Sequence, residues 1–273
     1  MNQPTSSAES MVRNSLRAGV FTIILNRPEA ANAIAPEQRD LIITLLAQAS
    51  ASAEVRVVVI QSTGKQFCSG ADVSRIAGAG ASAPVRHPGD VTQILLEGAQ
   101  RLIAAVLDCR KPVIAAVQGA AAGLGAHLAY ACDLIVAAEE ASFIESFVLR
   151  GLVVDAGGAY LLPRRIGMQK AKELAFFGDK LRAQDALALG LVNQVVPASE
   201  LGAAVEALAV RLSAAPTTAV SLAKRLLNRS LDVDRASAFL EEAMSQEINS
   251  ATQDSKEGVS AFVARRPPNF SGH

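Results

Sequence analysis

The segment KPVIAAVQGAAAGLGAH, residues 111–127, places a short apolar run directly before a turn of glycine and alanine. Pro112–Val117 is bounded by turn residues and has the pattern of a buried strand. The turn, Gln118–His127, runs straight into an apolar helix. Small residues at a helix start leave backbone N–H groups unpaired, with the positive end of the helix dipole behind them. The segment therefore predicts a strand, a helix and a site for negative charge between them.

A second turn of the same kind, Phe67–Asp72 (FCSGAD), follows an apolar strand predicted at Val55–Ile60. Two such turns facing each other would bind one oxygen that gains negative charge during a reaction, as an oxyanion hole does. Either turn taken alone more often marks a plain tight turn. A dinucleotide site does not fit, because Leu128 stands where the G-x-G-x-x-G pattern needs glycine or alanine. No GxSxG nucleophile elbow occurs.

Strands and helices alternate outward from these turns. Further strands are predicted at 20–25 and 133–137, and helices after Pro36 and at 91–107. This alternation favours an α/β fold with parallel strands. Residues 77–90, rich in Gly, Ala, Ser and Pro, are interpreted as a mobile loop. From about Met168 only helical patterns follow, at 171–177, 183–189, 201–212, 219–227, 236–248 and 254–264. Asp254 and Glu257 give the last of these a capping-box pattern.

Composition narrows the class of protein. The 273 residues carry 26 Lys plus Arg and 26 Asp plus Glu, so net charge favours neither nucleic acid nor an anionic membrane surface. No apolar run approaches the ~18 residues of a membrane helix, and Met1–Ser10 lacks the apolar stretch of a signal peptide. Three cysteines without CxxC spacing favour reduced thiols and a cytoplasmic location. No metal-ligand cluster is present in the sequence, so no metal site is predicted.

Seven sequence motifs, each occurring once, serve as landmarks along the chain. They are LNRPEAANAI at 25–34, FCSGAD at 67–72, KPVIAAVQGAAAGLG at 111–125, ACDLIVAAEEASF at 131–143, GLVVDAGGAYLLPRRIG at 151–167, ALALGLVNQVVP at 186–197 and EGVSAFVARRPPNF at 257–270. With these landmarks the chain resembles the enoyl-CoA hydratase/isomerase (crotonase) family from about residue 20 onward. Their order and spacing together are highly specific, although no single one of them would be.

This resemblance implies a crotonase-like spiral of ββα units with an all-helical C-terminal trimerisation region. It divides the chain into a flexible tail at 1–18, a core with the CoA-thioester site at 19–199 and a helical oligomerisation region at 200–273. It also implies an acyl-CoA or enoyl-CoA substrate, with coenzyme A as part of that substrate and no separate cofactor. The implied assembly is a homotrimer or a hexamer.

The resemblance also implies site residues. The thioester carbonyl would lie between the backbone N–H groups of Ser69 and Leu124. Contacts to the CoA portion would come from a larger set, in which the last two residues reach the CoA of a neighbouring subunit: Arg27, Ala30, Ser69, Gly70, Ala71, Asp72, Gly123, Phe262 and Arg265. Without the resemblance, Arg265 would be interpreted as part of a solvated helix end.

The acid–base residues favour one reaction over another. Hydratases of the family carry two glutamates, and here His127 and Phe147 stand at those positions. Phe147 transfers no proton, so the two-carboxylate hydration machinery is missing. Asp155 matches the position of the catalytic acid in isomerases of the family, and one carboxylate in an apolar pocket suits an allylic proton shift. An N-cap for the following helix is the alternative for Asp155. A packed residue is the alternative for His127.

Three hypotheses follow. The first is an enoyl-CoA isomerase that uses Asp155 as its base. The second is an enoyl-CoA hydratase with a rearranged acid/base site, in which Glu145 or Glu140 replaces a missing glutamate; Glu145 is nearer the pocket segment. The third is a non-catalytic acyl-CoA-binding paralogue that kept the oxyanion hole.

Overall fold

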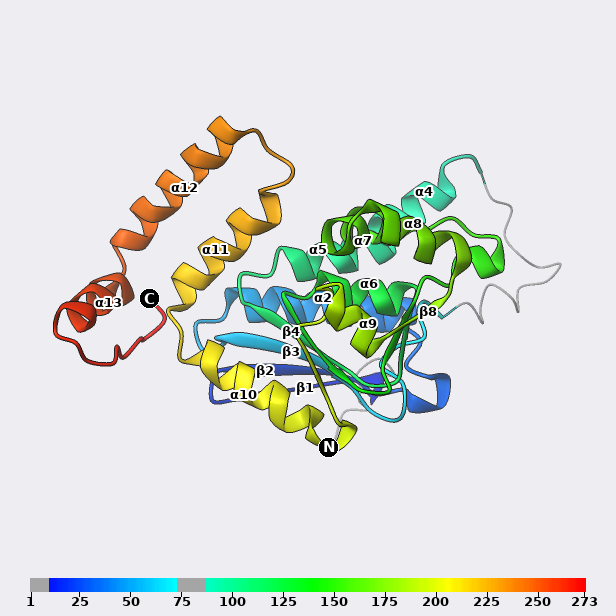
Figure 1. Cartoon of the computed structure of the whole chain (residues 1–273), viewed down its shortest axis with the longest axis horizontal. Helices are drawn as coiled ribbons and strands as arrows, with labels where there is room; N and C mark the ends of the chain where they lie inside the picture. Colours follow the sequence, from blue (N-terminus) through cyan, green and yellow to red (C-terminus); the bar gives the residue numbers. More distant parts are fainter. Residues whose placement is uncertain (1–9, 73–86) are drawn as a thin grey trace, which may run out of the picture.

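Two sheets form the centre of the protein, which is described by a computed structural model at residues 10–72 and 87–273 (Figure 1). The larger sheet has the strand order β1-β2-β3-β4-β6-β9, and the smaller has the order β5-β7-β8. In the larger sheet only the β1–β2 pair is antiparallel, and every other pair is parallel. The strands are β1 Val12–Arg17, β2 Val20–Leu25, β3 Val57–Ser62, β4 Val113–Val117, β5 Ala120–Ala122, β6 Leu134–Ala138, β7 Ser142–Ile144, β8 Lys180–Arg182 and β9 Gln194–Val196. The predicted α/β fold with parallel strands is confirmed.

The central strands are apolar on both faces because helices cover both. In β3, Val58 and Ile60 join the main core, whereas Val57 and Val59 face the opposite side. This alternation follows from the two-residue period of a strand. The main core is covered by a layer that includes α2 Pro36–Ala51, α5 Arg101–Leu107 and α6 Leu124–Ala131. The opposite side is covered by α10 Leu201–Ser213, which lies below the sheet in Figure 1, across the sheet from α2, α5 and α6.

The predicted boundary at residue 200 is wrong for α10. Its buried side chains, Leu201, Val205 and Ala209, pack against the back of the large sheet. This helix is therefore part of the core, and the C-terminal region that extends beyond the core begins at α11 Thr217–Arg229. The amphipathic pattern of α10 predicts a helix but does not reveal whether a sheet or a second subunit covers its apolar face.

The predicted flexible tail at 1–18 is wrong where β1 lies. Val12–Arg17 pairs in antiparallel register with β2, and the buried Val12 lies opposite Leu25. Ala18 and Gly19 form the two-residue connection with φ values of 49° and 80°, as a type I′ hairpin turn requires. A hydrophobicity pattern does not predict this strand, because only Val12 of its six residues is buried. It is an edge strand whose other five residues are exposed and, apart from Leu16, polar.

The remaining helices agree with the predicted order. The segment predicted at 91–107 is helical but contains a π-helical turn, η3 Leu96–Gln100, between α4 Asp90–Leu95 and α5. Residues 77–86 of the predicted loop lie outside the described residues. The short strands β8 and β9 interrupt a region predicted as helical only. The other elements are η1 Pro28–Ala30, η4 Val148–Arg150, α7 Gly158–Ile166, α8 Met168–Phe177, α9 Ala183–Ala188, η5 Ala198–Glu200, α11 Thr217–Arg229, α12 Arg235–Ser250 and α13 Gln253–Val263.

Helices α11, α12 and α13 extend from the core as an arm (Figure 1). The predicted capping role of Asp254 is wrong, because the N-cap of α13 is Thr252, whose side chain accepts a hydrogen bond from the Ser255 N–H. Asp254 is buried and instead accepts hydrogen bonds from the Ser271 and Gly272 N–H groups. It ties the end of the chain to the arm.

Candidate active site

The two glycine turns singled out from the sequence lie side by side. The Cys68 N–H donates to Ala120 O at 3.1 Å, and the Ala122 N–H donates to Cys68 O at 2.9 Å. Gly70 is packed against the second turn so closely that a Cβ there would lie 3.0 Å from Ala122 O and 3.8 Å from Leu124 N. The facing arrangement, which no local pattern could establish, is therefore present.

The amide of Ser69 is already bonded, contrary to the prediction that it faces the thioester. It donates to Ala31 O at 3.0 Å. The next residues run alongside Ile34, which donates to Gly70 O and accepts from the Asp72 N–H. Successive amides of an extended segment point to opposite sides, so the Ala71 N–H faces away from Ile34. Within residues 10–72 and 87–273 no acceptor is recorded for it, which makes Ala71 the free donor of this turn.

Leu124 is the first residue of α6, and its N–H has no acceptor within the helix. Gly123 precedes it with φ 50° and ψ −122°, a conformation that favours glycine. At the other end of the helix, Arg165 donates to Tyr130 O and Cys132 O at 2.7 and 2.8 Å and so satisfies two terminal carbonyls. The N-terminal amide of a well-anchored helix thus lies beside the turn that carries the free amide of Ala71. Together they are suited to one oxygen that develops negative charge.

Asp155 lies in the turn before α7, and its carboxylate does not cap that helix. The N-cap position is occupied by Gly157, and no side chain caps the helix. Only the Asp155 backbone carbonyl takes part in the turn, by accepting from the Gly158 N–H at 2.9 Å. Burial raises the pKa of the half-buried Asp155 carboxyl, and the nearby His127 partly opposes that shift. The capping alternative is therefore wrong, and the carboxylate is available as a base.

His127 is fully buried on α6 and is paired with Glu145. Its Nε2 lies 2.9 Å from Glu145 Oε2, and the Glu145 side chain is 1% exposed. The His127 ring stacks on Phe147 with centroids 5.3 Å apart and an interplanar angle of 13°. The edge of Phe147 lies 3.6 Å from where a Cβ on Gly123 would be. An aromatic ring therefore packs between the start of α6 and the His127–Glu145 pair.

Glu145 is the member of this cluster that the sequence interpretation underrated. It follows β7 in a stretch where exposure alternates, with Phe143, Glu145 and Phe147 buried and the residues between them partly exposed. Three residues at a two-residue spacing share one face of an extended chain. A glutamate between two phenylalanines on that face is the signal that could have identified it as buried and partnered.

The residues predicted to hold CoA divide into two groups. Arg27, Ala30, Ser69 and Asp72 lie together: the Arg27 Nη1 is 2.5 Å from Asp72 Oδ2, and the Ser69 hydroxyl donates to Ala30 O at 3.4 Å. Gly70, Ala71 and Gly123 belong to the adjoining turns described above.

Phe262 and Arg265 lie elsewhere, at the end of the arm (Figure 1). Phe262 is 85% exposed, and Arg265 follows α13 with φ 53°. The neighbouring Arg266 is paired with Glu257, whose pKa it lowers to about 2. A single chain therefore does not bring Phe262 and Arg265 to the turns.

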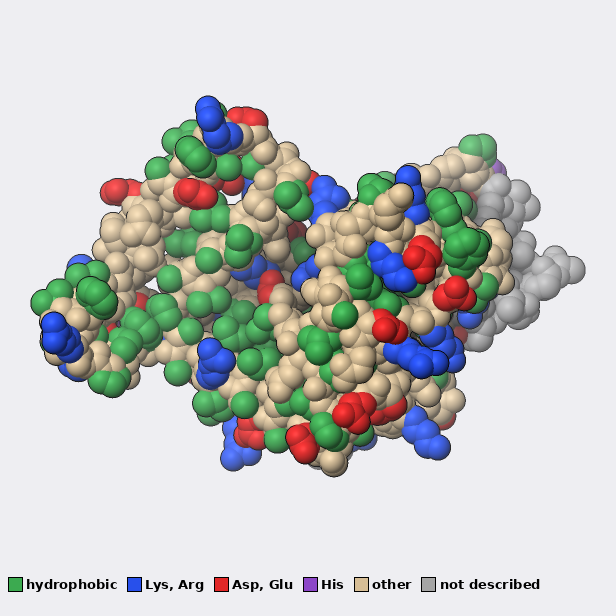
Figure 2. Space-filling view, viewed as in Figure 1, with side chains coloured by type: hydrophobic (Ala, Val, Ile, Leu, Met, Phe, Trp, Pro, Cys, Tyr) green, Lys and Arg blue, Asp and Glu red, His purple; other side chains and the backbone are tan. Residues whose placement is uncertain are grey.

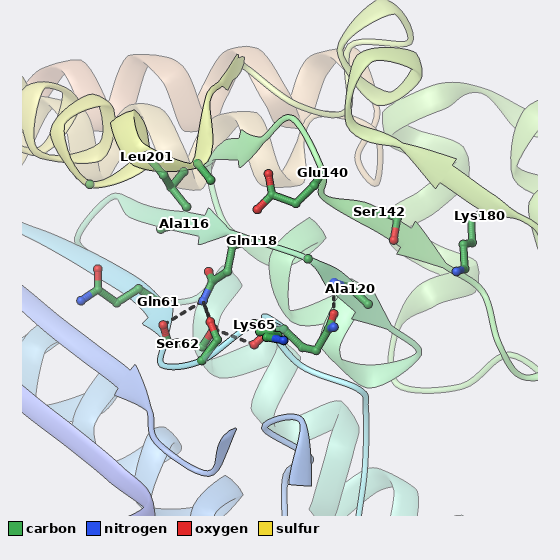
Figure 3. Close-up of a pocket in the computed structure, with 15 residues that line it drawn as sticks. Gln61, Ser62, Lys65, Ala116, Gln118, Ala120, Glu140, Ser142, Lys180 and Leu201 are labelled. Atoms are coloured by element: carbon green, nitrogen blue, oxygen red, sulfur yellow. Dashed lines mark hydrogen bonds between the residues drawn. The ribbon is translucent and has the colours of Figure 1, made fainter. Parts of the chain in front are cut away.

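A cavity of about 810 Å³ lies beside the carboxyl ends of β3 and β4, and its lining includes neither Asp155 nor the His127–Glu145 pair (Figure 3). Its polar side chains are largely engaged with the backbone around it. The Gln118 amide donates to Ser62 O and Ser62 Oγ, both at 2.9 Å, and Gln66 Oε1 accepts from the Ala120 N–H at 2.5 Å. These bonds support the strand ends that lead into both turns.

The described residues contain no group of three or more His, Cys, Asp or Glu side chains placed to hold a metal ion. Within the same residues, no helix is both long enough and apolar enough to cross a membrane. The three cysteines are buried free thiols, and burial raises the pKa of Cys68 to about 12.

Comparisons with known proteins identify the class. The family model for enoyl-CoA hydratase/isomerase matches residues 15–273. A protein of Rhodobacter capsulatus named probable enoyl-CoA hydratase is 35% identical over 96% of this chain and 98% of its own. The 1,2-epoxyphenylacetyl-CoA isomerase of Escherichia coli is 34% identical over the same shares. A crystal structure of an enoyl-CoA hydratase from Bacillus anthracis superposes with a TM-score of 0.88 at 31% identity, covering 96% of this chain and 100% of the other.

The fold, the paired amide turns and these matches define a crotonase-type acyl-CoA enzyme class. The chain belongs to the enoyl-CoA hydratase/isomerase family. Its relatives include proteins named for hydration and proteins named for isomerisation, so the site residues must distinguish the two reactions.

Proposed function

We propose that the protein is an enoyl-CoA isomerase that moves a double bond from C3–C4 to C2–C3 of an acyl-CoA thioester, or catalyses a related isomerisation of a ring-type substrate. The observation that carries the proposal is which carboxylates near the turns are free of a partner and which are already paired. Asp155 is half-buried and uncapped, and its pKa is raised by burial. Glu145 is buried and its Oε2 is paired with His127, and Phe147 occupies the position where a hydratase needs a second glutamate.

The reaction requires one base and one anion site. The Asp155 carboxylate removes a proton from C2, and the electron pair of that C–H bond moves toward the thioester, forming a dienolate whose oxygen carries the charge. The Ala71 and Leu124 N–H groups donate to that oxygen, with the dipole of α6 behind Leu124. Asp155 then returns the proton to C4, and the electrons shift to leave the double bond at C2–C3. Atoms and charge balance without water.

The CoA portion of the substrate would lie against the cluster of Arg27, Ala30, Ser69 and Asp72. Coenzyme A enters as part of the substrate, and the scheme uses no further cofactor. Donation from Ala71 rather than Ser69 keeps the Ser69–Ala31 hydrogen bond intact, so the turn holds the same shape while substrate binds.

The protein is proposed to act as a homo-oligomer, a trimer or a hexamer, assembled through the arm. Hydrophobic side chains gather over the arm in Figure 2, and Phe239, Leu240, Met244 and Phe262 are each more than half exposed in the single chain. An exposed apolar surface of this kind marks an interaction site. A neighbouring arm would bring its Phe262 and Arg265 to the CoA.

Hydration is the alternative, and it has some support from relatives named as hydratases. A rearranged hydratase would have to hold water between His127 and Glu145. Both side chains are inaccessible to solvent, at 0% and 1% exposure, and Phe147 is stacked on the imidazole. The site geometry therefore favours isomerisation. A non-catalytic acyl-CoA-binding protein is the third possibility that an assay must exclude.

The test is an ultraviolet and mass-spectrometric assay of the purified protein with a 3-enoyl-CoA and a 2-enoyl-CoA. Conversion of the 3-enoyl to the 2-enoyl form without a mass change, lost in Asp155→Asn, is expected. A gain of one water on the 2-enoyl substrate that survives Asp155→Asn would establish hydration instead. Binding of both thioesters without turnover would establish a non-catalytic protein.

A further inference from the structure

The first helix of the arm, α11, lies nearest the core and meets it through polar side chains (Figure 1). The side chains of α11 that are buried in the single chain, Thr217 and Lys224, are both polar. Four residues after Lys224, the Asn228 amide donates to Leu107 O at 3.1 Å. This spacing puts Lys224 and Asn228 on one face of the helix. Asp232 continues the same spacing just beyond the last helical residue.

Asp232 accepts two hydrogen bonds from α7, the helix that follows the turn of Asp155. The Tyr160 hydroxyl donates to Asp232 Oδ2, and Arg164 Nη2 donates to Asp232 Oδ1 at 2.7 Å. The Arg164 guanidinium also lies over the Tyr160 ring, 3.7 Å from its centroid. The bond from Tyr160, and then that from Arg164, hold the pKa of the Asp232 carboxyl below its ordinary value. These three side chains are named the α7 clamp.

A cavity lies behind the α7 clamp. Its volume is about 730 Å³, and its lining includes Leu161 of α7 and Leu227 of α11 as well as the three clamp residues. Well-packed interiors leave few voids larger than a water molecule. Where a cavity separates two helices, the contacts at its rim set their spacing. The clamp is such a contact between α7 and the arm.

The start of α7 is continuous with the turn of Asp155. The Tyr160 N–H donates to Gly157 O at 3.0 Å, and the Gly158 N–H donates to Asp155 O at 2.9 Å. Ala156 and Gly157 have φ values of 45° and 78°. A left-handed conformation is unfavourable for alanine and persists only where the surroundings impose it. A displacement of α7 would therefore move this turn and the Asp155 carboxylate with it.

The other end of α7 is joined to the helix that offers the proposed oxyanion donor. Arg165 donates to Tyr130 O and Cys132 O at 2.7 and 2.8 Å, at the end of α6. Leu124 is the first residue of that same helix. The adjacent Arg164 reaches the arm. Helix α7 thus connects the arm, the end of α6 and the turn of Asp155.

We propose that Asp232 is a positioning residue, which holds α7 from the arm and thereby fixes the Asp155 carboxylate relative to the Leu124 amide. The inference deepens the proposed function and rests on it, because it takes Asp155 as the base. Asp232 acts through α7 and does not touch the substrate. An exposed ion pair stabilises a fold little, but the requirement here is geometric. A displacement of about 1 Å at the reacting groups costs a rate factor of up to about 10².

The kinetic test compares two aspartates of the same loop. Asp232→Ala is expected to lower kcat about 10-fold or more. The KM for a 3-enoyl-CoA should be nearly unchanged, because the cluster proposed to hold CoA, at Arg27 and Asp72, lies elsewhere in the core. The Asp232 side chain is 38% exposed, so the substitution should not prevent folding. A kcat that does not change overturns the proposal.

Asp234→Ala is the matched control. Asp234 caps α12 by accepting from the Ala236 and Ser237 N–H groups at 2.8 and 3.1 Å, and within the described residues it shows no bond to α7. Its loss weakens the arm without releasing the clamp, so kcat should stay as in the unmodified protein. An equal loss of kcat in the two variants would show that any loosening of the arm has this effect, and overturns the assignment of Asp232.

Two further variants test the route through the clamp. Asp232→Asn keeps the shape of the side chain and an oxygen for Arg164, and is expected to lose less kcat than Asp232→Ala. Tyr160→Phe removes one donor, and its effect should disappear in the double variant with Asp232→Ala, because the hydroxyl acts through that carboxylate. Additive losses overturn the proposal.

Hydrogen exchange measured by mass spectrometry tests the clamp without substrate. Asp232→Ala is expected to speed exchange of the α7 amides at 158–166, and Asp234→Ala only of those at the start of α12. Unchanged exchange of α7 in Asp232→Ala overturns the proposal. If Asp155→Asn stays fully active, the assignment of the base is wrong, whatever the exchange shows. If Asp155→Asn is inactive and kcat ignores Asp232→Ala, only the positioning inference is wrong.

Discussion

Lys224, in the first helix of the arm, places its Nζ 2.8 Å from the Asp133 carboxylate of the core. The same ammonium group donates to Val106 O at 3.1 Å and to Lys111 O at 3.2 Å, so all three of its donors are used. Lys224 is buried, and burial raises the pKa of Asp133 even though Lys224 opposes that shift. This ion pair links α11 to the residue just before β6.

Removing one member of the pair should destabilise the protein strongly. Lys224→Met removes the ion-pair partner of a mostly buried carboxylate, which keeps the Val113 N–H as a donor, and removes one donor from each of two carbonyls. We expect a loss of about 3 kcal/mol in the free energy of unfolding, the low end for buried pairs. Urea denaturation followed by circular dichroism measures it. Lys170→Met is the matched control, because the Lys170–Glu173 pair is solvent-exposed and its loss should cost under ~0.5 kcal/mol. Equal effects of the two substitutions would contradict the structural assignment.

The proposed base should produce an acid limb in the pH–rate profile. Asp155 works as a carboxylate, so kcat/KM rises with pH as the group ionises. Burial raises its pKa, which places the midpoint above the ordinary aspartate value of about 3.9. A raised folded-state pKa also means that the charged form destabilises the fold at neutral pH. Asp155→Asn should therefore melt at a temperature no lower than that of the unmodified protein, and a lower melting temperature would argue for a structural role.

The amide of Leu124 can be removed by one substitution. Leu124 is the first residue of α6, where proline is tolerated because that N–H has no intrahelical partner. Leu124→Pro should lower kcat by a factor of about 10² to 10³, as loss of one oxyanion donor does. Leu124→Ala is the control, because it shortens the side chain but keeps the amide. If the two variants lose activity equally, the N–H is not the group that matters.

Some features of this protein follow from local pattern and others depend on distant contacts. The strand–turn–helix at 111–127 was predictable because burial, small turn residues and helix start all lie within one short segment. Whether Ser69 or Ala71 offers the free amide depends on Ala31 and Ile34, which approach from another part of the chain. No local signal reports that pairing.

Local sequence patterns have the same limit for the acid–base residues: they do not report contacts between distant parts of the chain. Phe147 and Asp155 were interpretable one at a time, because each has a single chemical property at a recognisable position. The His127–Glu145 pair is a property of two residues that are 18 positions apart. Burial of α10 against the sheet, rather than against another subunit, likewise depends on how the chain folds back.

The exposed apolar face of α12 should be an intersubunit surface. Leu240, Met244 and Ile248 are spaced by four residues and are each more than half exposed, so they form one stripe along the helix. Met244→Asp should convert the oligomer to a monomer in light scattering coupled to size exclusion. Glu242→Lys, a charge change at an exposed position of the same helix, should leave the assembly unchanged. A monomeric unmodified protein would contradict the assignment of the arm.

The contact between Gly158 and the His127 ring can be tested from both sides. Gly158→Ala places a methyl group into the ring, and overpacking of this kind costs about 1–3 kcal/mol. The control, Gly202→Ala in α10, meets no atom within 4 Å and should be neutral or stabilising by up to about 1 kcal/mol. Because His127→Ala opens the space that the added methyl group needs, the double variant should cost less than the sum of its parts. Additive losses would show that the ring does not hold Gly158, and with it the turn of Asp155, in place.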